Sequence, residues 1–198
     1  MFRRKPVPPP ATDRWLVVGL GNPGRDYERS RHNVGFMCID QLAGRQRVRA
    51  TQRVAKSLVG RIQLDDRELI LAKPQTMMNL SGFAVKALRT RYGTGLDRMV
   101  VIHDELDLPF GRVRLKKGGS SAGNHGLDSI IDSLGTRDFI RLRVGIGRPT
   151  GSGVDHVLGT FSREENEELT GILARAADAI TCLVELDLQR AMTEVNKT

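Results

Sequence analysis

The sequence has few cysteines, few histidines and no long apolar run, and each scarcity excludes a class of protein. Two cysteines in 198 residues, Cys38 and Cys182, cannot supply the disulfide framework of a small secreted protein. Both fall in apolar helical patterns, so we expect buried free thiols and a reducing, cytoplasmic location. The four histidines lack the spacing of metal ligands, and no metal site is predicted. No apolar run approaches the ~20 residues that cross a bilayer, so no membrane association is predicted.

Basic residues are in excess. Lysine and arginine number 31 against 23 acidic residues, which gives a formal net charge of +8. This balance favours a polyanionic partner such as a nucleic acid, and the alternative is a basic surface that serves only solubility. Residues 1–14 contain four basic residues and four prolines without the apolar core of a secretory signal. We expect a disordered, basic, proline-rich tail there.

Strand and helix patterns alternate along the rest of the chain. Apolar or alternating runs predict strands at 15–20, 68–72, 99–102, 112–116 and 140–146. Apolar residues at helical spacing predict helices over 34–44, up to about 92, over 127–134, and after the Ser162–Glu165 capping box. Residues 46–62 are weakly patterned and are expected to hold an irregular stretch and a strand. The sequence therefore predicts one α/β domain over 15–190, a mixed, mostly parallel twisted sheet flanked by helices, with a C-terminal tail at 191–198.

The stretch after the first predicted strand fits a dinucleotide-binding fingerprint. Gly19, Gly21 and Gly24 have the spacing GxGxxG. That fingerprint needs a helix to begin inside it, and residues 25–31 carry no apolar helical stripe. We therefore interpret the glycines as a backbone turn that exposes Asn22. A nucleotide-binding oxidoreductase stays an alternative that cofactor titration would test.

Polar side chains follow three of the predicted strands. Asn22 follows the first strand, Asn79 lies in a loop after another, and Asp104 follows the apolar strand at 99–102. Ligands bind beyond the carboxyl ends of strands in open α/β sheets, so these groups are expected to converge with His32. A histidine held by a carboxylate is a general base. No serine or cysteine lies in a recognisable nucleophile context, which favours direct attack by water, without metal or cofactor.

The motifs of this chain resemble those of bacterial-type peptidyl-tRNA hydrolases over residues 15–188. The resemblance rests on long segments in the family's order, at 18–24, 31–35, 73–82, 103–109, 118–127, 141–147 and 154–161, together with Tyr27. The family hydrolyses the ester between a peptide and the 3′ end of tRNA, and so recycles tRNA from aborted translation.

The resemblance implies a role for each matching residue. His32 would activate water and Asp104 would orient it. Asn22 and Asn79 would position the ester and the peptide amides. The remaining matches are Met78 as an apolar wall, Tyr27 near the terminal adenosine, and Arg114 with Arg143 as a clamp for the 5′-phosphate of the tRNA acceptor stem.

One loop departs from the family pattern. The family often has His-Asn-Gly-Leu where this chain has Asn124-His125-Gly126-Leu127. Either the two roles are exchanged within the loop, or His125 gives the hydrogen bond that an amide would give. Both residues are predicted to bind substrate.

The sequence thus predicts a monomeric, cytoplasmic hydrolase that binds peptidyl-tRNA and needs no cofactor. The alternative is a non-catalytic RNA-binding protein of the same fold. The presence of His32, Asp104, Asn22 and Asn79 favours the enzyme.

Overall fold

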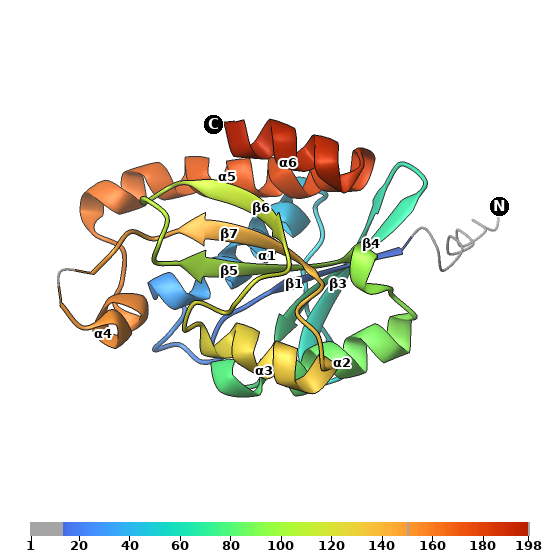
Figure 1. Ribbon diagram of the computed structural model, residues 1–198, viewed down its shortest axis with the longest axis horizontal. Coiled ribbons are helices and arrows are strands. Elements are labelled where there is room, and N and C mark those ends of the chain that lie inside the picture. Colours follow the sequence, from blue (N-terminus) through green and yellow to red (C-terminus); the bar gives the residue numbers. More distant parts are fainter. Residues whose placement is uncertain (1–13, 150, 198) are drawn as a thin grey trace.

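A mixed sheet forms the middle layer of the part of the chain that the computed structural model describes, residues 14–149 and 151–197 (Figure 1). Within these residues seven strands lie in the order β2-β3-β4-β1-β5-β7-β6. Strands β4, β1, β5 and β7 run parallel, whereas β2, β3 and β6 pair antiparallel at the two edges. The bounds are β1 Arg14–Gly19, β2 Gln52–Val54, β3 Ser57–Leu64, β4 Arg67–Pro74, β5 Met99–Glu105, β6 Val113–Lys117 and β7 Ile140–Gly145.

Helices cover both faces of the sheet, as Figure 1 shows. α1, α5 and α6 pack on one face around a large apolar cluster, and α2 and α3 pack on the other around a second. The bounds are α1 Val34–Arg45, α2 Ser81–Tyr92, α3 His125–Leu134, α4 Gly153–Leu158, α5 Arg163–Glu185 and α6 Leu188–Lys197, with short 3₁₀ turns η2 Arg31–Asn33, η3 Met78–Leu80 and η4 Leu96–Arg98. The arrowheads of β5 and β7 point to the end of the sheet where α4 lies.

The sequence-based fold class is confirmed. The strands at 15–20, 68–72, 99–102, 112–116 and 140–146 correspond to β1, β4, β5, β6 and β7, and the capping box of Ser162 and Glu165 opens α5. Parallel pairing is confined to the four central strands, so the sheet is mixed and less parallel than expected. Both cysteines are free, but only Cys38 is fully buried, whereas Cys182 is half-buried.

Three regions differ from the expectation or lie beyond it. The weakly patterned stretch contains the β2–β3 hairpin, whose turn residues Ala55 and Lys56 have positive φ of 48° and 55° without a glycine to mark them. The expected tail at 191–198 is helical as far as Lys197, because α6 packs against β6 and α5. The tail predicted for residues 1–14 lies outside the described residues except for Arg14, which begins β1.

The glycines of β1 and α1 let two backbones touch. A Cβ on Gly19 would lie 2.2 Å from the carbonyl oxygen of Gly35, and a Cβ on Gly35 would lie 2.5 Å from Leu20 N and from the Ile102 carbonyl oxygen. Only glycine permits so close an approach. The first turn of α1 is therefore pressed against β1 and β5, which places η2 and its His32 at the carboxyl ends of these strands.

Candidate functional site

His32 and Asp104 form a buried pair at the carboxyl end of the central strands. His32 Nδ1 lies 2.8 Å from Asp104 Oδ2, and the two residues are 9% and 5% exposed. Because a carboxylate only accepts hydrogen bonds, Nδ1 carries the proton and Nε2 keeps a lone pair. The pair can therefore take a proton from a water molecule at Nε2.

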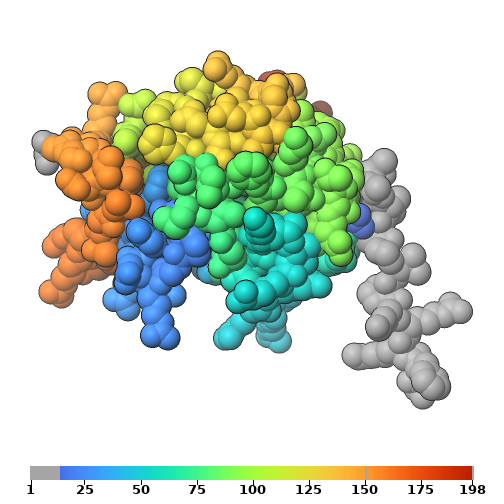
Figure 2. Space-filling model, turned by 90° about the horizontal axis from the view of Figure 1, so that it is seen from below, coloured from blue at the N-terminus to red at the C-terminus, as the bar shows by residue number. Residues whose placement is uncertain are grey.

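A cleft of about 290 Å³ opens beside this pair. The loop before α3 and the residues of α4 form much of its wall, including Asn124, His125 and Val154. Figure 2 shows the segments around the site on one face: the turn after β1 in blue, η3 in green, α3 in yellow and α4 in orange. Ser121 also lines the cleft, yet among the described residues no hydrogen bond links its hydroxyl to His32. The geometry therefore offers a base but no aligned serine nucleophile.

Asn124 holds the second oxygen of the Asp104 carboxylate. Its Nδ2 donates to Asp104 Oδ1 at 2.9 Å, and its Oδ1 accepts from the backbone N–H groups of Gly126 and Leu127 as the N-cap of α3. Both ends of this amide are thus engaged within the protein. His125, in contrast, has a 76% exposed side chain and reaches only Asp128, at 3.8 Å.

Asn22 is buried, so the expectation that its turn exposes it is wrong. The residue is 5% exposed, and its Oδ1 accepts from Met78 N at 2.7 Å. Asn33 Oδ1 accepts from Asn22 N at 2.8 Å, and Asn33 Nδ2 donates to Asn22 O at 2.9 Å. Asn22 lines a second hollow of about 350 Å³ together with Lys73 and other residues. The backbone of Asn22 is therefore fixed, and its Nδ2 is left to act as a donor.

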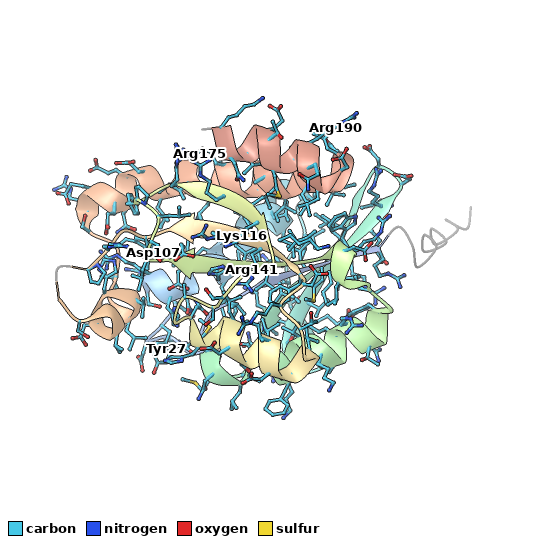
Figure 3. All side chains as sticks on the ribbon, viewed as in Figure 1. Tyr27, Asp107, Lys116, Arg141, Arg175 and Arg190 are labelled. Atoms are coloured by element: carbon cyan, nitrogen blue, oxygen red, sulfur yellow. The ribbon has the colours of Figure 1, made fainter. Side chains whose placement is uncertain are left out.

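The other predicted site residues lie outside the 290 Å³ cleft. Met78 is buried against α3, because a Cβ on Gly126 would lie 2.5 Å from the Met78 sulfur. Asn79 is exposed in η3, and Tyr27 is half-buried in the turn after β1, near the bottom of Figure 3. The structure brings His32, Asp104, Asn124 and His125 together at one cleft. Met78, Asn79 and Tyr27 do not line that cleft.

Arg114 and Arg143 face each other across the β6–β7 pair. The antiparallel register sets them directly opposite, which is the side-by-side arrangement that the alternating pattern permits. Arg143 Nε donates to Glu105 Oε2 at 2.8 Å, and the Glu105 carboxylate is 7% exposed. Glu105 therefore fixes the orientation of the Arg143 guanidinium.

Sequence analysis assigned no role to Asn33, Glu105 or His103. Asn33 and Glu105 adjoin predicted catalytic residues, but their contacts depend on the tertiary fold. His103 Nδ1 donates to the Asp104 carbonyl oxygen at 2.7 Å, and burial lowers the pKa of this imidazole. A neutral His103 therefore helps to fix the backbone of Asp104.

An α/β fold with a carboxylate-held histidine beside an open cleft fits the class of hydrolases that use a histidine base. Within residues 14–149 and 151–197 no cluster of potential metal ligands is found, and no helix has the length and apolar character to cross a membrane.

The chain belongs to the peptidyl-tRNA hydrolase family, whose sequence model matches residues 16–198. It is 45% identical over 186 residues to a peptidyl-tRNA hydrolase of Dehalococcoides mccartyi, covering 91% of this chain and 98% of that protein. It is 49% identical over 172 residues to the one of Frankia alni, covering 86% and 87%. The crystal structure of the Acinetobacter baumannii enzyme superposes with a TM-score of 0.86 at 34% identity, covering 93% of this chain and 95% of that one. The predicted family is confirmed.

Proposed function

We propose that this protein hydrolyses the ester that links a peptide, or an N-blocked aminoacyl group, to the 3′-terminal ribose of tRNA. The proposal rests first on the His32–Asp104 pair, buried and 2.8 Å apart at the edge of an open cleft. Family membership supports the same reaction. Release of tRNA in this way recycles it from aborted translation, in the cytoplasm and by a monomer.

Each step has an assigned group. His32 Nε2 takes a proton from water, and the hydroxide forms a bond to the ester carbonyl carbon. The tetrahedral intermediate collapses, the bond to the ribose oxygen breaks, and that oxygen receives the proton that His32 Nε2 took from water. The products are a tRNA with a free terminal hydroxyl and a peptide carboxylic acid, which loses its proton to solvent. Asp104 holds the Nδ1–H tautomer of His32 and stabilises the imidazolium that forms.

The surrounding residues bind and position the substrate. Asn22 Nδ2 and Asn79 donate to the ester and peptide amides, Met78 forms an apolar wall, and Tyr27 lies near the terminal adenosine. Asn124 is better suited to hold Asp104 than to bind substrate, because both ends of its amide are engaged. His125 takes the substrate-facing role, since its exposed side chain lines the cleft.

Arg114 and Arg143 bind the 5′-phosphate at the acceptor stem. They lie opposite each other in register, and Glu105 orients Arg143 through Nε, so its terminal N–H groups can bind a phosphate. Arginine is suited to this because its planar fork matches phosphate oxygens.

The decisive experiment is incubation with N-acetylated aminoacyl-tRNA beside free aminoacyl-tRNA, with release of the acyl group measured for each. We expect release from the N-blocked substrate only. Binding of tRNA without release from either substrate would instead support the non-catalytic RNA-binding alternative.

A further inference from the structure

Arg141 is a buried cation in the middle of the sheet. It lies on β7, between β5 and β6, and is 2% exposed (Figure 3). Its guanidinium carbon lies 4.9 Å from the centroid of the Phe139 ring. Burial lowers the pKa of Arg141, and the positive charges of Arg143 and Arg137 lower it further. Burying a charge under such repulsion lowers the stability of the fold, so we expect the buried Arg141 to have a function that offsets this cost.

The hydrogen bonds of Arg141 go to the loop that leads into the site. Nη1 donates to the Ser120 carbonyl oxygen at 2.5 Å and Nη2 to the Gly119 carbonyl oxygen at 2.7 Å. These are backbone acceptors, and among the described residues no ion pair is found for Arg141. The planar fork thus contacts two successive carbonyl groups through two N–H groups at a fixed spacing, a geometry that a single ammonium group lacks.

The gripped loop, residues 118–124, has little else to fix it. Positive φ angles occur at Gly118, Gly119, Ala122 and Gly123. Among the described residues its other backbone hydrogen bonds are those of Gly118 N to Phe139 O, Asn124 N to Ser121 O and Asp128 N to Asn124 O. Glycine-rich backbone loses much conformational freedom when it is ordered, so this loop needs an external constraint.

The loop ends at the residue that contacts the catalytic pair. Asn124 Nδ2 donates to Asp104 Oδ1, and the other oxygen of Asp104 lies against His32 Nδ1. Residues 121–123 also line the cleft. Hydrogen bonds at its two ends therefore connect this loop to the Arg141 guanidinium and, through Asn124 and Asp104, to the proposed base.

We propose that Arg141 is a positioning residue for the hydrolytic reaction: its guanidinium orders the loop 118–124, and the ordered loop holds Asn124 on Asp104. This inference rests on the proposed function. We expect the loss of Arg141 to lower turnover more than stability. An apolar side chain of similar length at this position on β7 removes a buried charge and keeps the packing, so the fold is retained.

The test compares Arg141→Met and Arg141→Lys with Arg190→Met, a control whose native side chain is 77% exposed on α6. We expect kcat on N-acetylated aminoacyl-tRNA to fall about 10- to 100-fold in Arg141→Met. In Arg141→Lys we expect a smaller fall, and in Arg190→Met none. Millimolar guanidinium should restore part of the lost rate in Arg141→Ala, which a general loss of stability would not allow. Hydrogen exchange should rise in residues 118–124 and stay low in β7.

Coupling to Asn124 provides the second measurement. Because both residues act on the same carboxylate, the double variant Arg141→Met, Asn124→Ser should have a kcat only slightly below that of the slower single variant. Losses that multiply would contradict the inference, and so would an active Arg141→Met with normal kcat. If Arg141→Met fails to fold, Arg141→Lys carries the same comparison. An inactive wild type would contradict the proposed function instead, while unchanged loop exchange in the variants would still overturn the role of Arg141.

Discussion

Replacing Asn124 by aspartate tests how the Asp104 carboxylate, the proposed partner of the base, is held. Aspartate caps a helix as well as asparagine does, so α3 keeps the two hydrogen bonds at its N-terminus. The donor to Asp104 Oδ1, 2.9 Å away, becomes a second carboxylate. Two like charges at this separation repel by on the order of 4–6 kcal/mol at an effective dielectric constant of about 20.

Part of that repulsion is relieved by solvent, by movement or by protonation of one carboxyl group. If two thirds is relieved, about 2 kcal/mol is left, which corresponds to about a 30-fold loss of kcat. Asn124→Ser is the matched control, because serine also caps the helix but adds no charge. Its loss should be about tenfold, the lower range for one hydrogen bond to a charged group.

The assay is single-turnover hydrolysis of N-acetylated aminoacyl-tRNA, with circular dichroism to verify that each variant is folded. The reasoning requires the order wild type, Asn124→Ser, Asn124→Asp in falling rate. A folded Asn124→Asp variant within twofold of the wild-type rate would refute it.

Three further outcomes are expected. The double variant Arg114→Ala, Arg143→Ala should raise KM for full-length tRNA substrates, and the slope of log KM against log salt concentration should flatten by about one unit per lost phosphate contact. KM for a minimal substrate without the 5′-phosphate should change little. Equal losses on both substrates would contradict the clamp. Burial lowers the pKa of His103, so the unfolded state binds the extra proton and the free energy of unfolding should fall as pH drops below about 6.5. The fall should be smaller in His103→Gln. Urea unfolding that shows the same pH dependence in the wild type and the variant would disprove this. Burial raises the pKa of Cys38 to about 12, so iodoacetamide at pH 8 should label the half-buried Cys182 first. Peptide mass spectrometry measures the two labelling rates. Faster labelling of Cys38 would contradict its burial.

Much of the fold follows from periodicity, which depends on the sequence alone. The apolar run at 99–102 and the capping box at Ser162 predict β5 and α5, because each is a local pattern with a local cause. The β2–β3 hairpin escaped detection because Ala55 and Lys56 adopt positive φ without glycine. Helix α6 was missed although its apolar residues, at 188, 191, 192 and 195, have helical spacing, because the segment is short and polar on average and its helix is stabilised by packing on β6 and α5.

Four residues of the 290 Å³ cleft were named from the sequence, but their contacts were not. A strand end pointed to Asp104 and a helix start after the first strand pointed to His32, since neighbouring parallel strands end at one edge of the sheet. The burial of Asn22 and the hold of Asn124 on Asp104 depend on residues distant in sequence, so no local pattern encodes them. The glycines around Asn22 had been interpreted as a turn, whereas Gly19 is required by its contact with Gly35.

The most direct test of the account is the hydrolysis rate of His32→Ala beside His125→Asn. Both histidines line the same cleft, but only His32 is paired with Asp104. The account predicts that His32→Ala lowers kcat by on the order of 10²–10⁴ with tRNA binding nearly unchanged, while His125→Asn keeps most of the activity. Near-normal turnover by His32→Ala, or loss of one limb of the pH–rate profile in His125→Asn, would contradict the assignment of His32 as the base.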